Sequence, residues 1–371
     1  MHLAIGIYKY FPFSGLALDM LRIANESVNR GHQVTIFTRS WQGDKPENIT
    51  VVELKARGLS NHAKAMSFHR LFFDHIDNGT FDLTIGFNKI PSVDYYFCGD
   101  YCYRAHSINK NSFLYRLTPR YRSFCYFENE IFSSKSKTKI LSLSEHEKGV
   151  FKQHYQTQDS RFIDLPPMLE KAKWVNNKCL PSRTDAREAL GIEGDNNAVL
   201  FVGSGFERKG LDRIIKALAK LPLDLREKTF LYVIGQDKAK PYEALANTLG
   251  IVNQVIFLGG RKDVPSIMRA GDLLVHPARA ELAGGVIIEG IVSGLPVLVT
   301  SVCGYSTHVS ASKAGIVLGG EFSQGELDSK LTYMLSSSKK TEWHNNGIEY
   351  SKNDDLYAMS KCAVDAFESR L

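Results

Sequence analysis

The hydrophobic pattern at the start of the chain predicts a strand, a helix and a second strand. Residues 3–7 are an apolar run, and from Leu16 apolar residues recur with a helical period until Gly31, which suits a left-handed helix cap. Residues 34–37 (Val-Thr-Ile-Phe) are predicted to form a second strand. Continuously apolar strands are typical of a parallel sheet with both faces covered. This stretch therefore predicts a βαβ unit.

The same alternation returns in the second half of the chain. The predicted strands there are 199–202, 230–234, 255–258, 273–276, 296–300 and 316–318. The predicted helices are 211–221, 242–249, 264–270, 285–292 and 325–335. We therefore expect an α/β protein of two Rossmann-like domains, with ligands at the carboxyl ends of the strands, facing the cleft between the domains.

A segment with little periodicity separates the two halves. Residues 159–195 include Pro166, Pro167 and Pro181 among many polar residues. We place an N-terminal domain at 1–165, a C-terminal domain at 166–353 and a final helix at 354–371.

Composition excludes several classes of protein. Of the 371 residues, 43% are apolar and 23% are charged, which rules out a disordered chain, a collagen and a small disulfide scaffold. The six cysteines include no CxxC pair, so we expect reduced thiols rather than a metal site. The N-terminus has no targeting signal, and the longest apolar stretch, 283–302, is too interrupted to span a bilayer.

A glycine-rich loop with two cations follows the strand predicted at 199–202. Residues 203–210 read Gly-Ser-Gly-Phe-Glu-Arg-Lys-Gly and precede a predicted helix. Glycines let a backbone approach a ligand, and a helix N-terminus favours anions. A diphosphate would fit beside Arg208 and Lys209, although the spacing matches neither a Walker A loop nor the dinucleotide fingerprint. The alternative is a surface loop with two solvated cations.

Two glutamates bracket a second glycine-rich turn. Gly284 and Gly285 should open a helix, with Glu281 before it and Glu289 inside it among apolar residues. A carboxylate in such a helix is costly unless it meets polar partners, and sugar or ribose hydroxyls would serve. The alternative is that Glu289 faces solvent at the helix end. In the first half, Gly15 starts a predicted helix and Asp19 follows one turn later, which by itself is a weak signal of catalysis.

Residues 101–140 are basic and aromatic. They hold eight Lys/Arg and two acidic residues, a net charge of +6 that equals the net charge of the whole chain. Residues 101–132 also hold nine aromatic side chains. This combination suits an anionic membrane surface or single-stranded nucleic acid. The alternative is a helical layer with one core face and one solvated face. The candidate contact residues are Arg104, Lys110, Arg116, Arg120 and Arg122.

The spacing of the two glutamates around a glycine-rich interior resembles the EX7E motif of the retaining family 4 glycosyltransferases, which have the GT-B fold of two Rossmann-like domains facing a central cleft. Further segments resemble the members that glucosylate the lipopolysaccharide core. These segments are 8–13 (Tyr-Lys-Tyr-Phe-Pro-Phe), 86–89 (Gly-Phe-Asn-Lys), 113–117 (Phe-Leu-Tyr-Arg-Leu) and 303–305 (Cys-Gly-Tyr). The resemblance covers nearly the whole chain.

The resemblance implies a retaining transfer of glucose from UDP-glucose to an inner-core heptose of lipopolysaccharide. Arg208 and Lys209 would neutralise the diphosphate in place of a metal, so no metal or cofactor is expected. Glu281 would hold the donor sugar, Glu289 the ribose and Arg261 the uracil end. The donor would also meet Gly15, Ala283, Gly284, Gly285 and Val286.

The resemblance further implies that Asp19 lies at the acceptor hydroxyl, so that the catalytic set is Asp19, Arg208, Lys209 and Glu281. The final helix would cross back onto the N-terminal domain. Two departures from the family pattern stand out. Ser14 replaces a glycine and narrows the loop before Gly15, and Met168 replaces a glycine after the paired prolines and crowds the hinge.

A lipid-linked acceptor implies a cytoplasmic protein held peripherally on the inner face of the bacterial inner membrane, with no nucleic-acid partner. Two other functions fit parts of the pattern. A UDP-sugar epimerase of the same fold would turn over without an acceptor, and residues 101–140 would then have no role. A non-enzymatic nucleotide-sugar or nucleic-acid binding protein would show no turnover and strongly salt-dependent RNA binding.

Overall fold

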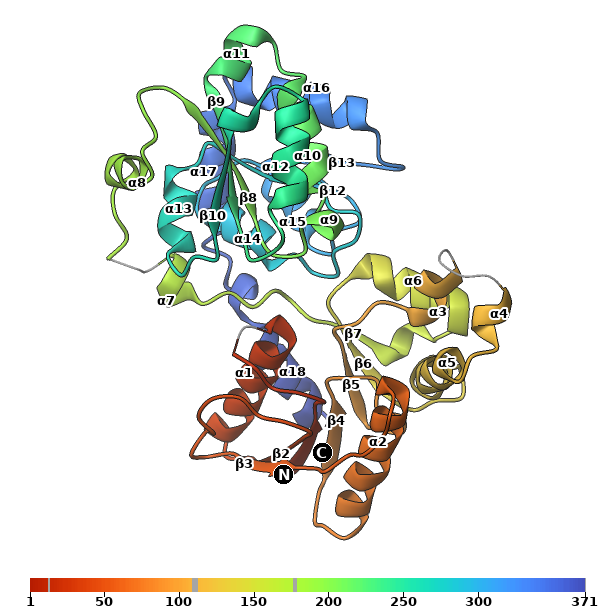
Figure 1. Ribbon diagram of the computed structural model, residues 1–371. Coiled ribbons are helices and arrows are strands. Elements are labelled where there is room, and N and C mark those ends of the chain that lie inside the picture. Colours follow the sequence, from red (N-terminus) through yellow and green to blue (C-terminus); the bar gives the residue numbers. More distant parts are fainter. Residues whose placement is uncertain (13, 109–112, 176–178, 371) are drawn as a thin grey trace. The chain divides into compact units, whose positions relative to one another are not determined.

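The computed structural model describes residues 1–12, 14–108, 113–175 and 179–370 and divides the chain into two compact units. The N-terminal unit comprises Met1–Met168 together with the chain from Ala358 onward, and the C-terminal unit is Leu169–Tyr357. Both are α/β units built on a parallel sheet, as the hydrophobic pattern predicts (Figure 1).

The N-terminal unit is built on a seven-stranded sheet in the order β3-β2-β1-β4-β5-β6-β7. Its strands are β1 His2–Gly6, β2 Gln33–Thr38, β3 Thr50–Glu53, β4 Leu83–Gly86, β5 Tyr95–Cys98, β6 Lys139–Ser142 and β7 Phe162–Asp164. Its helices are α1 Gly15–Asn29, α2 Asn61–Asp77, α3 Tyr103–Ile108, α4 Phe113–Arg116, α5 Pro119–Phe132, α6 Glu145–Tyr155 and α18 Met359–Glu368.

Helices cover both faces of this sheet. Neighbouring residues of a strand point to opposite faces, and β5 shows the result. Tyr95 packs edge-on against Phe367 of α18 with ring centroids 4.9 Å apart, whereas Tyr96 packs against Phe132 of α5 at 5.7 Å. One face therefore carries α1 and α18, and the other carries the aromatic core under α2, α5 and α6.

The C-terminal unit is built on a six-stranded sheet in the order β10-β9-β8-β11-β12-β13. Its strands are β8 Asn197–Val202, β9 Thr229–Ile234, β10 Val255–Gly259, β11 Leu273–His276, β12 Val297–Thr300 and β13 Gly315–Leu318. Its α-helices are α7 Lys171–Trp174, α8 Arg183–Ala189, α9 Phe206–Lys209, α10 Leu211–Ala219, α11 Leu223–Glu227, α12 Lys240–Thr248, α13 Val264–Ala270, α14 Gly285–Val292, α15 Ser306–Ser312, α16 Gln324–Ser336 and α17 Lys340–Tyr350. All the strands and helices predicted for this half are present.

The division between the units falls after Met168 rather than after residue 165, and α18 begins at Met359 rather than at residue 354. Both differences have the same local cause. The Pro167 carbonyl accepts a hydrogen bond from the Met359 amide, which keeps the paired prolines with α18. Residues 354–357 form a 3-10 turn of the C-terminal unit, where Asp354 pairs with Lys171 at 2.8 Å.

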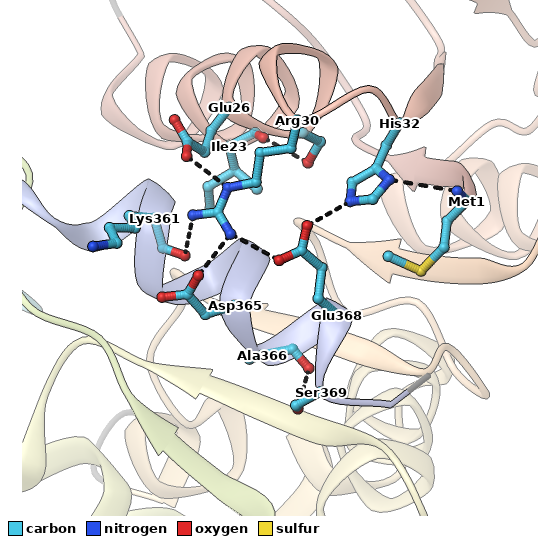
Figure 2. A network of polar contacts seen from close by, with 11 residues as sticks. Met1, Ile23, Glu26, Arg30, His32, Lys361, Asp365, Ala366, Glu368 and Ser369 are labelled. Atoms are coloured by element: carbon cyan, nitrogen blue, oxygen red, sulfur yellow. Dashed lines mark hydrogen bonds and ion pairs between the residues drawn. The ribbon is translucent and has the colours of Figure 1, made fainter.

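An ion-pair network joins α18 to α1 (Figure 2). The Arg30 guanidinium contacts Glu26 at 2.9 Å on its own helix, and Asp365 at 2.6 Å and Glu368 at 2.9 Å on α18. His32 Nε2 lies 2.9 Å from the other oxygen of Glu368. The helix at the end of the chain is thus held onto the first helix by one arginine with three carboxylate partners.

Within the described ranges, no helix combines the length and the apolar character needed to cross a bilayer.

Candidate active site

The two glycine-rich loops of the C-terminal unit meet because their strands are neighbours. Residues 203–210 follow β8 and residues 277–284 follow β11, and these strands pair in parallel. Their carboxyl ends therefore lie side by side at one edge of the sheet, which is where open α/β sheets bind ligands.

A four-residue helix interrupts the first loop. The prediction that residues 203–210 form one loop opening directly into a helix is wrong by one turn, because α9 precedes α10. Gly205 and Gly210 take left-handed φ values of 80° and 79° and so set off this turn at both ends. Arg208 and Lys209 therefore lie in the last turn of α9 rather than at the open start of α10.

Lys209 folds back over the loop that precedes it. A Cβ atom added at Gly203 would lie 2.7 Å from Lys209 Nζ, and Gly203 has a φ of +127°. Any side chain at this position would therefore displace the ammonium group. The side chain of Lys209 is only 12% exposed, so its charge acts in a partly desolvated setting.

The carboxylate of Glu281 contacts three polar side chains at this edge of the sheet. Its Oε2 atom lies 2.9 Å from Arg208, 3.0 Å from Lys209 Nζ and 3.5 Å from His276 Nε2. Burial alone would raise the pKa of Glu281, but the histidine contact and the two cations outweigh it and hold that pKa far below its ordinary value. Glu281 is therefore an anion, and the group of two cations and one carboxylate carries a net positive charge.

His276 is the residue of this group that the sequence analysis missed. It ends β11, is fully buried, and burial lowers its pKa, so the ring is neutral. Neither ring nitrogen makes a hydrogen bond to the described part of the chain, and Nε2 faces the Glu281 carboxylate at 3.5 Å. A polar residue at the carboxyl end of a strand predicted as buried was the available signal.

The helix predicted at 285–292 is present as α14, and Gly284 is its N-cap with a φ of 88°. Gly284 has no side chain that could cap α14, and the Ile287 amide donates to the Gly284 carbonyl at 2.9 Å, so the amides of Gly285 and Val286 are the ones that a ligand could bind. The backbone before it is fixed by β12 and the turn that follows: Gly304 donates to the Glu281 carbonyl at 3.1 Å and Tyr305 to the Ala283 carbonyl at 2.8 Å. Residues 283–286 thus carry the helix N-terminus beside Glu281.

Arg261 and Glu289 are the other two side chains of the C-terminal unit that are predicted to bind the donor. Arg261 follows β10, the edge strand, and pairs with Asp263 at 2.6 Å. Glu289 lies in the middle of α14, half-buried among the buried residues Val286–Ile288. The binding roles of Arg261 and Glu289 remain predictions.

Gly15 and Asp19 lie in α1 of the N-terminal unit, and their roles also remain predictions. Ser14, a departure from the family pattern, is the N-cap of α1, and its hydroxyl accepts from the Ala17 amide at 3.4 Å. Asp19 lies 3.0 Å from Arg22, and burial raises the pKa of the Asp19 carboxyl although the arginine opposes this.

The basic segment of the N-terminal unit has an exposed surface. Among the candidate cations, Lys110 lies outside the described residues, and four are exposed without an ion pair in the described part of the chain: Arg104, Arg116, Arg120 and Arg122. Leu114, Leu117 and Tyr126 are exposed beside them, at 72%, 60% and 50%. The aromatic side chains of this segment fall into two sets. Tyr126 is exposed, whereas Phe127 and Phe132 are fully buried in the core and cannot reach a membrane.

Glu128 anchors the start of this basic segment. The carboxylate is fully buried and receives Lys89 Nζ at 2.6 Å and the Tyr155 hydroxyl at 2.7 Å. It also accepts the backbone amides of Tyr103 at 2.5 Å and Arg104 at 3.1 Å, the first residues of α3. A single buried carboxylate therefore joins α3, α5, α6 and the loop after β4.

The fold and the site define a glycosyltransferase: the family model of the group 1 glycosyl transferases matches residues 182–354, and the chain belongs to this family. Over 366 residues it is 40% identical to the lipopolysaccharide glucosyltransferase WaaG of Escherichia coli K12, covering 98% of both chains. The crystal structure of WaaG, a glycosyltransferase involved in lipopolysaccharide biosynthesis, superimposes with a TM-score of 0.89 over 98% of this chain and 99% of that one.

A more distant structure shares the fold alone. HepE of Anabaena, solved in complex with UDP-glucose, matches with a TM-score of 0.72 at 19% identity and full coverage of both chains. The predicted GT-B architecture of two Rossmann-like domains is thereby confirmed, and the chain is an enzyme of glycosyl transfer.

Proposed function

We propose that this enzyme transfers glucose from UDP-glucose to an inner-core heptose of lipopolysaccharide, with retention of configuration and without a metal. The observation that carries the proposal is the 40% identity to a lipopolysaccharide glucosyltransferase along 98% of the chain. Arg208, Lys209 and the amide end of α14 support the choice of a diphosphate-bearing donor, since they place positive charge at one sheet edge.

The chemistry follows from where charge develops. As the bond between glucose and the diphosphate breaks, negative charge grows on the leaving phosphate, and Arg208 and Lys209 stabilise it. Glu281 keeps both cations in place before the donor arrives, because its Oε2 contacts both. Retention is explained by attack of the acceptor hydroxyl from the leaving-group side, with its proton passing to the departing phosphate.

Mass spectrometry of the acceptor tests this function. Truncated core lipopolysaccharide that ends in the inner-core heptoses should gain one hexose when incubated with enzyme and UDP-glucose, and much less with UDP-galactose. An enzyme that modifies no lipopolysaccharide acceptor, or that converts UDP-sugars without one, would disprove the proposal.

Chelation tests the metal-free donor site. We expect excess EDTA to leave kcat/KM for UDP-glucose unchanged, because two side-chain cations supply the charge that Mg²⁺ supplies elsewhere. The measurement is UDP release with and without EDTA, after prior dialysis against chelator. A rate that collapses with EDTA and recovers with magnesium would contradict the assignment of Arg208 and Lys209.

We further propose that the exposed face of residues 101–140 binds the anionic membrane that holds the acceptor, which gives the enzyme a peripheral location on the cytoplasmic side. Arg104, Arg116, Arg120 and Arg122 supply the charge, and Leu114, Leu117 and Tyr126 supply apolar contact. Nucleic acid is not a proposed partner.

Vesicle co-sedimentation tests this surface. The triple variant Arg116→Gln, Arg120→Gln, Arg122→Gln should lose roughly 3 kcal/mol of binding to anionic vesicles, on the order of 100-fold, because each basic residue near the surface contributes about 1 kcal/mol. Wild type should detach at high salt and ignore neutral vesicles. The matched control, Arg57→Gln, Lys64→Gln, Arg70→Gln, removes three exposed cations in and just before α2. Equal losses in both triple variants would mean that only net charge matters.

A further inference from the structure

The N-terminal unit has an arginine at the ligand-binding edge of its own sheet. Arg39 directly follows β2, and Tyr8 follows β1, which is the neighbouring strand. Both therefore lie at carboxyl ends of parallel strands, where ligands bind in open α/β sheets. Arg39 is half-buried, and burial lowers its pKa from the ordinary arginine value.

The guanidinium of Arg39 has almost no partners. It donates from Nε to the Tyr8 carbonyl at 3.4 Å, and its Cζ lies 4.7 Å above the Tyr8 ring. Within the described ranges, no carboxylate lies within ion-pair distance of it. A guanidinium has five N–H donors, and within the described residues only one of these donates to the protein.

Two other arginines, the buried Arg161 and the half-buried Arg213, are satisfied by the protein. Arg161 donates to the carbonyls of Thr138 at 2.9 Å and Ser133 at 2.7 Å, which completes a structural role. Arg213 donates to the Pro277 carbonyl at 2.9 Å and lies over the Phe322 ring. Arg39 makes no comparable set of hydrogen bonds, so its partly desolvated charge is not explained by the fold.

The surroundings of Arg39 hold it in place without neutralising it. The Tyr8 amide donates to the Asn88 side chain at 2.7 Å, and the Tyr8 hydroxyl lies 2.7 Å from His69 Nε2. Burial and the charge of Arg39 lower the pKa of His69 to about 3, so this ring is neutral at physiological pH. The Arg39 amide donates to the Tyr8 carbonyl at 3.1 Å. These contacts fix Tyr8, whose carbonyl and ring in turn position the guanidinium of Arg39 without neutralising it.

Partial burial of a charge costs free energy unless a partner of opposite charge compensates it. A guanidinium binds carboxylate or phosphate groups through paired hydrogen bonds. We propose that Arg39 is the centre of an anion subsite in the N-terminal unit, which binds a phosphate or carboxylate carried by the acceptor. The exposed Lys9, next to Tyr8 in the chain, adds a second positive charge. The inference deepens the proposed function, because it assigns a chemical class to the acceptor.

The test compares acceptors with and without charge. Wild type and Arg39→Gln are assayed with intact truncated core lipopolysaccharide, with the same acceptor after removal of its phosphates, and after methyl esterification of its carboxylates. We expect Arg39→Gln to raise the acceptor KM at least tenfold on the intact acceptor, with the KM for UDP-glucose unchanged. For wild type, the acceptor KM should rise by a similar factor when the anion that Arg39 binds is removed from the acceptor. For Arg39→Gln, removal of the same anion should leave the acceptor KM unchanged. If wild type and Arg39→Gln have equal KM values on the dephosphorylated acceptor, the bound group is a phosphate. If their KM values are equal on the methyl-esterified acceptor, the bound group is a carboxylate.

Controls separate this inference from fold and from function. Arg70→Gln removes an exposed arginine on α2 and should behave as wild type, and Arg39→Lys should recover part of the lost affinity. Equal KM losses for Arg39→Gln on charged and uncharged acceptors would overturn the subsite. Failure of wild type to glucosylate any acceptor would overturn the proposed function instead, and calorimetric titration of the intact acceptor into wild type and Arg39→Gln would then decide the subsite alone.

Discussion

Replacing Lys209 by alanine should lower kcat/KM for UDP-glucose by 10²- to 10³-fold, about 2.7–4 kcal/mol of transition-state stabilisation, which is the typical cost of removing one preorganised donor to a developing anion. The side chain is 12% exposed and its Nζ lies 3.0 Å from Glu281, so the charge is fixed in a partly desolvated place before substrate arrives. A fixed charge of this kind needs little reorganisation during the reaction. The measurement is steady-state UDP release at varied UDP-glucose.

The matched control for Lys209→Ala is Lys220→Ala, which removes an exposed lysine just after the far end of α10 and should leave kcat/KM within twofold. Lys209→Arg should retain more activity than Lys209→Ala because the charge is kept. A folded Lys209→Ala enzyme with kcat/KM within threefold of wild type would show that Lys209 only holds Glu281. In that case Glu281→Gln should be the more damaging variant.

Replacing Glu128 by alanine should cost about 3–5 kcal/mol of stability, the usual result of leaving one partner of a buried ion pair alone. Lys89 would then lose its carboxylate at 2.6 Å, and the first amides of α3 would lose their acceptor. For a unit of this size the expected fall in Tm is about 6–20 °C. Differential scanning calorimetry of the full chain measures it.

Three further variants define what Glu128 contributes. Glu130→Ala, two residues along α5 and only half-buried, should change Tm little. The double variant Lys89→Met, Glu128→Leu should recover part of the loss, because no buried charge is left alone, but not all of it, because the amides of Tyr103 and Arg104 stay unsatisfied. Glu128→Gln should fall between wild type and Glu128→Ala. A Tm of Glu128→Ala equal to that of Glu130→Ala would contradict the anchoring role.

The C-terminal unit could be predicted from the sequence because its signals are local. Strand, glycine turn and helix follow one another within a few residues, so α13, α14 and β11 were placed with their observed limits. The turn α9 escaped notice because four residues are too few for a helical period. The contact between Glu281 and Lys209 could not be predicted from the sequence either. It depends on β8 and β11 being neighbours in the sheet, and β9 and β10 separate these two strands in the chain.

Most elements of the N-terminal unit between its second strand and the domain boundary had no clear pattern. Its strands β3 to β7 are three or four residues long, and its helices carry aromatic residues on more than one face, which obscures a helical period. The resemblance singled out Asn88 and Lys89 as a motif but gave them no role. In the structure Asn88 holds the amide of Tyr8 and Lys89 pairs with Glu128, 39 positions away. Such pairings depend on topology, and no spacing within the sequence indicates them.

The attachment of α18 to α1 has a consequence for biosynthesis. Arg30 is translated early, whereas Asp365 and Glu368 are translated only after the entire unit Leu169–Tyr357. Asp365 is 335 positions after Arg30, so at roughly 5–20 residues per second the growing chain waits about 17–67 s between these events. During that interval the sheet of the N-terminal unit has an uncovered face around Tyr95, and the C-terminal unit can finish folding before the N-terminal unit does. Premature termination before α18 would therefore damage the part of the enzyme that the ribosome made first.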